Sequence, residues 1–221
     1  MNENYTGVNL DALYRYAGSS GGAQPKVFIK IDGKEWLVKF RTSTDKKNTG
    51  KIEYKYSLLA KKCGINMPET RLFGGKYFGV ERFDRSPAGK IHTISAAGLL
   101  NVNYRIPSLD YSTLLIACHD LTKNMEEVCD LFRLMVFNIA IKNRDDHAKN
   151  FSFQLIGNEW KLSPAYDILP SNGFLGYHTT TVNNRGEPKL SDILAVADAA
   201  GLSKHRVKYI LEKVNIVVKF L

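Results

Sequence analysis

Short apolar runs separated by turns dominate the first third of the chain. Residues 27–30 (VFIK) and 35–40 (EWLVKF) are two such runs, and the Asp32-Gly33 pair between them is a strong signal for a tight hairpin turn. Residues 77–83 (YFGVERF) form a third run. This pattern predicts a β-hairpin followed by a further strand.

Helical signals appear once in this region and again in the second half. Residues 51–63 are rich in helix formers and stop at Gly64, which readily adopts the left-handed conformation of a helix end. Residues 125–141 repeat apolar side chains at helical spacing, and residues 191–221 return to a helical pattern. These three segments are expected to be helices.

The two halves of the chain therefore differ in character. Two further short strands are expected at residues 151–156 and 160–162, between the central helix and the helical tail. We predict an α+β chain in two lobes, with a small β-rich N-lobe over residues 1–85 and a mostly helical C-lobe over residues 86–221.

Composition fits a globular protein. The 221 residues are 44% hydrophobic and 24% charged, and no stretch approaches the ~20 consecutive apolar residues that span a membrane. Residues 1–11 are polar and lack the apolar core of a secretory signal, and the three widely spaced cysteines suit a reducing compartment. We expect a cytoplasmic protein without a membrane partner.

The formal net charge of +9 is unevenly distributed. Residues 26–62 contain eleven Lys or Arg and four Asp or Glu. A basic surface of this kind suits nucleic acid, nucleotide phosphates or an acidic partner, and it also occurs as a solvated face. Charge alone therefore does not decide the function.

The polar loop after the central helix contains the residues with the clearest chemistry. Asp145 and Asn150 stand five apart behind Arg144, as in the R-D-x-x-x-x-N pattern of kinases. A carboxylate there can orient an attacking hydroxyl, and an amide oxygen can bind Mg²⁺. Asp167 follows seventeen residues after Asn150, where the expected hairpin brings the chain back. We predict phosphoryl transfer, with Asp145 as the catalytic carboxylate and Asn150 and Asp167 as metal ligands.

The upstream half contains matching parts for ATP. Residues 18–26 (GSSGGAQPK) are small and flexible enough to bring backbone N–H groups close to phosphates, although they do not form a Walker A sequence. Lys39 lies on a predicted strand, like the strand lysine that pairs with nucleotide phosphates in kinases, and Glu53 is a candidate ion-pair partner. A plain glycine turn and solvated charges are the alternative interpretations.

Two further residues lie inside the polar loop. Lys149 can neutralise the γ-phosphate as a point charge. His147 either holds the loop through its ring nitrogens or contacts the nucleotide, and both interpretations stay open.

With these residues assembled, the sequence resembles the HipA-like family of bacterial serine/threonine kinases, whose founding members are toxins of toxin–antitoxin modules. The matching segments are residues 19–26 (SSGGAQPK), 80–85 (VERFDR), 145–152 (DDHAKNFS) and 163–167 (SPAYD). The resemblance implies a bilobal protein-kinase-like fold, ATP and Mg²⁺ as cofactors, and a kinase of the bacterial cytoplasm, with delivery into another cell left open.

The resemblance also assigns roles residue by residue. It implies that Asp145 is the catalytic base and that Asn150 and Asp167 bind the metal. Residues 21–26 would cover the phosphates, and residues 81–83 would form the hinge that reads adenine. The implied ATP-binding residues are Gly21, Gly22, Ala23, Gln24, Pro25, Lys26, Lys39, Glu81, Arg82, Phe83, Asp84, His147, Ala148, Lys149, Asn150, Tyr166 and Asp167.

Regulation and partners follow from the same resemblance. The family includes kinases that autophosphorylate a serine at the start of the glycine loop, a position that Ser19 matches, with Ser20 as the second candidate. A phosphate there would add about two negative charges beside the site for the ATP phosphates. The implied partners are a protein substrate, such as an aminoacyl-tRNA synthetase, and an antitoxin; direct sequence-specific binding to nucleic acid is not expected.

The chain departs from the family pattern in two places. Full-length members carry an additional N-terminal subdomain, whereas the glycine loop begins here by residue 18. We expect that subdomain to be absent or encoded as a separate protein. Asp146 stands where many members have glycine, and the sequence does not indicate what this second acid changes.

Two rival functions remain at this stage. Asp145, His147 and Asn150 also fit the D-x-H-x-x-N loop of lipid kinases and small-molecule kinases. A non-enzymatic basic nucleic-acid-binding module is an alternative of another class, motivated by the net charge of +9, although the chain lacks a recognition-helix motif or an aromatic RNA platform.

Overall fold

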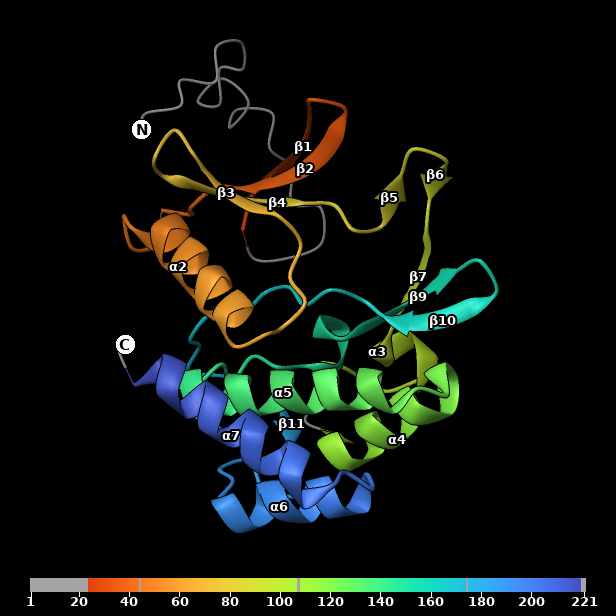
Figure 1. Cartoon of the computed structure of the whole chain (residues 1–221). Coiled ribbons are helices and arrows are strands. Elements are labelled where there is room, and N and C mark those ends of the chain that lie inside the picture. Colours follow the sequence, from red (N-terminus) through yellow and green to blue (C-terminus); the bar gives the residue numbers. More distant parts are fainter. Residues whose placement is uncertain (1–23, 44, 107, 174, 220–221) are drawn as a thin grey trace.

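The structure is a computed structural model and describes residues 24–43, 45–106, 108–173 and 175–219 (Figure 1). Its N-terminal part contains a four-stranded antiparallel sheet in the order β1-β2-β4-β3. Asp32 and Gly33 make the β1–β2 turn with φ angles of 51° and 79°, the left-handed geometry that a tight hairpin needs. The strands are β1 (Lys26–Ile31), β2 (Lys34–Lys39), β3 (Thr70–Phe73) and β4 (Tyr77–Glu81).

The two faces of this sheet differ. Phe28, Leu37 and Val80 are paired across β1, β2 and β4, so they lie in one row on one face. The alternate positions of the strands point to the opposite face, which carries a small core of its own. That core consists of Trp36, Val38, Phe40 and Phe73.

Helix α2 (Thr49–Lys62) packs against β3 and β4. Ser57 is buried, and its Oγ lies 2.9 Å from Oγ1 of Thr70 on β3. Gly50 allows the first turn to approach the β3–β4 turn, because a Cβ there would lie 2.3 Å from the carbonyl oxygen of Lys76. This packing places the buried Glu53 next to the sheet.

A hairpin and a three-stranded antiparallel sheet connect this region to the helices. The β5–β6 hairpin follows β4 and leads to β7, which pairs with β9, and β9 pairs with β10 (Figure 1). The bounds are β5 (Arg85–Ser86), β6 (Gly89–Lys90), β7 (His92–Ser95), α3 (Ala96–Leu99), β9 (Ser152–Ile156) and β10 (Glu159–Leu162).

The C-terminal part is built around helix α5 (Met125–Ile141), which is buried along most of its length. Asn124 caps its start by accepting a hydrogen bond from the Glu126 N–H at 2.9 Å, and Lys142 ends it with a φ of 57°. Helices α4 and α7 pack against α5, and α6 packs against α4. The remaining elements are β8 (Leu109–Asp110), α4 (Tyr111–Thr122), η1 (Ala148–Asn150), β11 (Thr180–Thr181), α6 (Leu190–Ala199) and α7 (Lys204–Val218).

The larger core cluster joins the two parts. It combines buried side chains of α4, α5, α6 and α7 with Ala60, Cys63 and Ile65 from the end of α2 and the residues just after it. Helix α2 therefore contacts the sheet near its beginning and the helical core at its end.

The structure confirms the α+β prediction, with a β-rich N-terminal part and a helical C-terminal part. The central helix has the expected bounds, and the β1–β2 hairpin and the β9–β10 hairpin form as predicted. The tail is helical as predicted and consists of two helices, with the left-handed Gly201 between them. The division at residues 85 and 86 stays a prediction. Within the described ranges, no helix has the length and apolar character needed to cross a membrane.

Candidate active site

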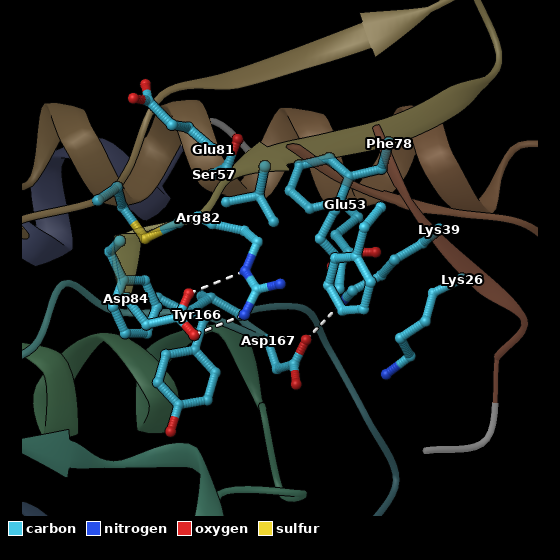
Figure 2. Close-up of a pocket in the computed structure, with 16 residues that line it drawn as sticks. Lys26, Lys39, Glu53, Ser57, Phe78, Glu81, Arg82, Asp84, Tyr166 and Asp167 are labelled. Atoms are coloured by element: carbon cyan, nitrogen blue, oxygen red, sulfur yellow. Dashed lines mark hydrogen bonds and ion pairs between the residues drawn. The ribbon is translucent and has the colours of Figure 1, made fainter. Parts of the chain in front are cut away.

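Two adjoining cavities form one cleft below the sheet, with volumes of about 280 Å³ and 650 Å³. We call the smaller one the apolar cavity and the larger one the polar cavity. Both are lined by the same five side chains, so a ligand can extend from one into the other. These shared residues are Lys26, Lys39, Glu53, Tyr166 and Asp167 (Figure 2).

The apolar cavity is a slot between the sheet and the helical part. Its upper wall is the row of Phe28, Leu37 and Val80, and Met67 and Ile168 also line it. Such walls suit a flat ring that stacks between apolar side chains. None of these five residues was among the predicted site residues, although the strand register explains why three of them share one face.

Residues 81–83, which the family resemblance implies as the hinge, line one end of this cavity together with Asp84. Gln154 on β9 donates a hydrogen bond from Nε2 to the carbonyl oxygen of Phe83 at 2.9 Å, and the ring of Phe83 lies 5.5 Å from that of Tyr166. The hinge is therefore attached to the β9 sheet. Its backbone, rather than a mobile side chain, is the fixed feature at this end of the cavity.

The charged side chains of this segment all have ion-pair partners: Arg82 and Asp84 pair with each other, and Glu81 pairs with Lys34. Arg82 donates two hydrogen bonds to Asp84, at 2.9 and 2.6 Å, and its guanidinium lies 4.3 Å from the centre of the Phe28 ring. The hydrogen bond from Arg82 lowers the pKa of Asp84. Glu81 turns away from the cavity in Figure 2 and pairs with Lys34 at 2.8 Å.

Lys39 stands where the two cavities meet. Its Nζ lies 2.7 Å from Oε1 of Glu53 and also contacts the carboxylate of Asp167, and the lysine side chain is only 12% exposed. Burial lowers the pKa of Lys39, but the two carboxylates outweigh it and hold the pKa above its usual value. Burial likewise raises the pKa of Asp167, and Lys39 brings it below its usual value. A charged amine is thus held between two carboxylates at the mouth of the slot.

The polar loop begins where α5 ends, and Asn143 near its start is hydrogen-bonded to the backbone of Asp167. Asn143 Nδ2 lies 3.1 Å from Oδ1 of Asn138 and 3.3 Å from the carbonyl oxygen of Asp167. Asp167 itself has a φ of 53°, which is uncommon outside glycine. These contacts bring the loop and the segment after β10 to the same side of the polar cavity.

Asp145, Asn150 and Asp167 all line the polar cavity. Asn150 donates from Nδ2 to the carbonyl oxygen of Asp145 at 2.8 Å, so its amide oxygen faces away from that carbonyl. Partial burial raises the pKa of Asp145, His147 opposes this rise, and the negative charges of Asp167 and Asp146 add to it. The carboxylates of Asp145 and Asp167 and the amide of Asn150 therefore border the same space.

An aromatic residue that the sequence did not single out packs against the loop and lines the polar cavity. Tyr104 lies with its ring 3.6 Å from Nζ of Lys149 and 5.7 Å from the ring of His147. Tyr166 donates from its hydroxyl to the carbonyl oxygen of Lys149 at 2.6 Å. Nδ1 of His147 is buried and has no hydrogen-bond partner among the described residues. The ring of Tyr104 therefore packs against His147, and both interpretations of His147 stay open.

The residues that could hold Mg²⁺ are few but chemically suitable. The described part of the chain has no group of three or more His, Cys, Asp or Glu side chains placed to bind a metal. Mg²⁺ commonly takes one or two protein oxygens, with phosphate oxygens and water completing its shell. The Asn150 amide and the Asp167 carboxylate could supply these one or two protein oxygens.

The structure brings together most of the predicted site. Pro25 and Ala148 line neither cavity: the carbonyl oxygen of Pro25 accepts from the Phe40 N–H at 2.8 Å, and Ala148 is buried. The predicted positions Gly21, Gly22 and Ala23, together with Ser19 and Ser20, lie outside the described residues. The predicted residues that line the cleft are Gln24, Lys26, Lys39, Glu81, Arg82, Phe83, Asp84, Asp145, His147, Lys149, Asn150, Tyr166 and Asp167.

The known proteins that are similar to this chain include the following three. The curated protein Y4dM of Sinorhizobium fredii, named as a candidate kinase, is 24% identical over 208 residues, which cover 86% of this chain and 48% of that protein. HipA of Shewanella oneidensis MR-1, solved with HipB and operator DNA, has a TM-score of 0.72 and 20% identity, over 91% of this chain and 57% of that one. The Helicobacter pylori proinflammatory kinase CtkA has a TM-score of 0.54 and 13% identity, over 87% of this chain and 89% of that one.

The two structural neighbours establish the fold, and a family model establishes the family. The chain spans about half the length of the curated relative that it matches. Its likeness to HipA and CtkA confirms the bilobal, protein-kinase-like fold expected from the sequence. The family model of the HipA-like C-terminal domain matches residues 18–220, and the chain therefore belongs to the HipA-like C-terminal domain family.

Proposed function

We propose that this chain is an ATP-dependent kinase that transfers a phosphoryl group to a serine or threonine of a protein. One observation carries the proposal: an apolar slot and a polar cavity share Lys39 and Asp167, and Asp145 and Asn150 line the polar side. A nucleotide has this same division, with a flat base at one end and phosphates at the other. The kinases among its structural neighbours have the same fold.

Each part of the cleft has a role in this proposal. The purine ring stacks between the apolar row on the sheet, which includes Leu37, and Ile168 on the opposite side. It lies beside the backbone of the hinge. Lys39 and Lys149 neutralise the phosphates. Mg²⁺, when bound by Asn150 and Asp167, would spread the charge that develops on the phosphate oxygens.

Asp145 performs the remaining step. Its carboxylate accepts a hydrogen bond from the attacking hydroxyl, orients the oxygen towards the γ-phosphorus and receives the proton as the new P–O bond forms. The bond from the γ-phosphorus to the bridging oxygen breaks, and ADP leaves. The raised pKa of Asp145 strengthens it as a base.

The partners and regulation stay proposals of the same kind. The HipA structure from Shewanella oneidensis contains HipB, which supports an antitoxin as a partner of this chain in the bacterial cytoplasm. The protein substrate would be a translation component such as an aminoacyl-tRNA synthetase. Autophosphorylation at Ser19 or Ser20 would regulate ATP binding, and a separate protein would supply the N-terminal subdomain.

Incubation with γ-labelled ATP and Mg²⁺ tests this function. The chain is incubated alone, with bacterial lysate and with lipid vesicles, and the labelled products are hydrolysed to identify the modified amino acid. We expect label on protein serine or threonine. Label only in lipid would identify a lipid kinase instead, and no transfer to any acceptor, together with no ATP binding, would contradict the proposal.

A nucleic-acid-binding module has less support. The +9 charge motivates it, but the lysines at the centre of the cleft, Lys39 and Lys149, are engaged with a carboxylate pair and an aromatic ring rather than spread over an open face. Salt-sensitive binding to DNA that persists in an Asp145→Asn variant would favour this alternative.

A further inference from the structure

Asp146 follows the candidate base directly, yet its side chain points into the core and is fully buried. Its Oδ2 accepts a hydrogen bond from the Tyr111 hydroxyl at 2.9 Å and lies 2.9 Å from Nδ1 of His178. Its Oδ1 accepts from the backbone N–H groups of Thr179, at 2.9 Å, and Thr180, at 3.3 Å. An ionised carboxylate has about four acceptor sites, so these donors saturate it.

The same two threonines hold the backbone on both sides of Asp145. The carbonyl oxygen of Arg144 accepts from Thr179, through N at 3.2 Å and Oγ1 at 2.9 Å. The carbonyl oxygen of Asp146 accepts from Oγ1 of Thr180 at 2.5 Å. The carbonyl groups of the two residues on either side of the candidate base are therefore fixed to one short segment, residues 178–180.

The two neighbouring carboxylates have opposite surroundings. Asp145 is exposed and borders the polar cavity, whereas Asp146 is enclosed by protein donors. Taking a carboxylate out of water is costly unless donors compensate it. The buried, fully hydrogen-bonded carboxylate of Asp146 lies next to Asp145, whose orientation matters most for the proposed chemistry.

We propose that Asp146 is a positioning residue, whose buried carboxylate holds the loop to residues 178–180 so that the side chain of Asp145 is directed into the polar cavity. The proposal rests on the proposed kinase function for its effect on catalysis. Asp146 does not touch substrate in this role. It acts through the backbone of Asp145.

A second aspartate provides a matched control. Asp110 accepts hydrogen bonds from the next stretch of the same segment, from Oγ1 of Thr181 at 2.7 Å and the N–H of Asn184 at 2.8 Å. It also accepts from the Ser112 N–H at 2.9 Å and so ties this stretch to helix α4 instead of the loop. An Asp110→Ala variant removes comparable contacts without touching residues 144–146.

Steady-state kinetics separate positioning from folding. We expect Asp146→Ala to lower kcat about 100-fold, because a misplacement of the order of 1 Å in a reacting group has this effect. The KM for ATP should change much less than kcat, since the hinge and Lys39 lie on other elements. Asp110→Ala should lower the melting temperature and leave kcat unchanged.

Conservative variants keep the test decisive if Asp146→Ala does not fold. Asp146→Asn retains an oxygen for the two backbone N–H groups, and Tyr111 and His178 can rotate or change tautomer to accept from its amide. We expect Asp146→Asn to recover part of the lost kcat. Thr180→Val removes the single hydroxyl bond to Asp146 with little change of shape and should lower kcat with a smaller effect on the KM for ATP.

Hydrogen–deuterium exchange gives a second readout that does not require activity. Peptides covering residues 143–147 should exchange faster in Asp146→Ala, or in Asp146→Asn, than in Asp110→Ala. Equal exchange in these variants, full kcat in Asp146→Ala, or an equal loss of kcat in Asp110→Ala would overturn the proposal. If the wild-type chain transfers no phosphate, the proposed function fails, and the exchange comparison still decides whether Asp146 holds the loop.

Discussion

At the scale of single residues, the contact that defines the cleft is the amine of Lys39 between Glu53 and Asp167. The sequence placed Glu53 only as a candidate partner, and the structure shows the pair with 2.7 Å between the charged atoms. Glu53 is almost completely buried, so its charge is useful only if Lys39 faces it. Helix α2 thereby sets where the amine stands in the cleft.

Substitution of Glu53 tests this role. In Glu53→Gln the neutral amide can no longer hold the amine as an ion pair, and Lys39 is left to Asp167 alone. We expect kcat/KM for ATP to fall ~10-fold, since a hydrogen bond to a charged group contributes about 1.5–3 kcal/mol. Steady-state kinetics at varied ATP measure this loss.

The matched control for this prediction is Glu69→Gln. Glu69 also pairs with two cations, Lys34 at 3.1 Å and Arg71 at 2.8 Å, but it lines neither cavity. Its kinetics should equal those of the wild type. Equal effects of the two substitutions would show that the position of Glu53 beside Lys39 is irrelevant to ATP.

At the scale of elements, the hinge and strand β9 act together. The hydrogen bond from Gln154 to the carbonyl oxygen of Phe83 attaches the end of the apolar cavity to the three-stranded sheet. In Gln154→Ala the carbonyl loses this donor and the hinge backbone gains freedom. We expect ATP affinity, measured by calorimetry, to fall about 2- to 10-fold, from the ~0.5–1.5 kcal/mol of a neutral hydrogen bond.

The Gln154→Asn variant keeps an amide group but shortens the side chain, so it tests whether the reach of the side chain to the carbonyl of Phe83 matters. The shorter amide cannot span the same gap, so its ATP affinity should resemble that of Gln154→Ala. Wild-type affinity in both variants would mean that the hinge does not depend on β9.

The elements that the sequence predicted well are those with complete local signals. Helix α5 combines an apolar repeat with an abrupt change to polar residues after Ile141, so its bounds could be predicted. Strand β3 (Thr70–Phe73) has four residues and no clear alternation, and it forms because β4 pairs with it. Helix α4 was not predicted, although Asp110 at its N-cap is visible in the sequence.

The candidate site divides in the same way. Asp145, Asn150 and Asp167 fall in a fixed order along the chain, and local spacing was sufficient to propose them. The partners of Asp146 come from residues 111 and 178–180, more than thirty positions away in either direction. Such long-range contacts depend on the packed fold, and the local sequence contains no signal for them.

At the scale of the whole molecule, the half-buried Asp110 links stability to pH. Burial raises the pKa of Asp110, but the donors of Asn184, Thr181 and Ser112 outweigh it and hold this pKa below its usual value. A carboxyl group with a lowered pKa in the folded state stabilises the protein above the unfolded-state value of ~3.9. That stabilisation is lost as the pH falls through the lower, folded-state pKa.

Denaturant unfolding at several pH values tests this linkage. We expect the free energy of unfolding to decrease on acidification below about pH 4, and to decrease less steeply in Asp110→Asn, which has no carboxylate to protonate. Parallel curves for the wild type and the variant would show that Asp110 contributes nothing to the acid sensitivity.

The most direct test of the account is phosphoryl transfer by Asp145→Asn, measured beside its affinity for ATP. The side chain borders the polar cavity and does not contact the hinge, so ATP should bind as tightly as to the wild type. Loss of the base should lower the transfer rate about 10²–10⁴-fold. Undiminished transfer by this variant would contradict the assignment of the cleft as a kinase active site.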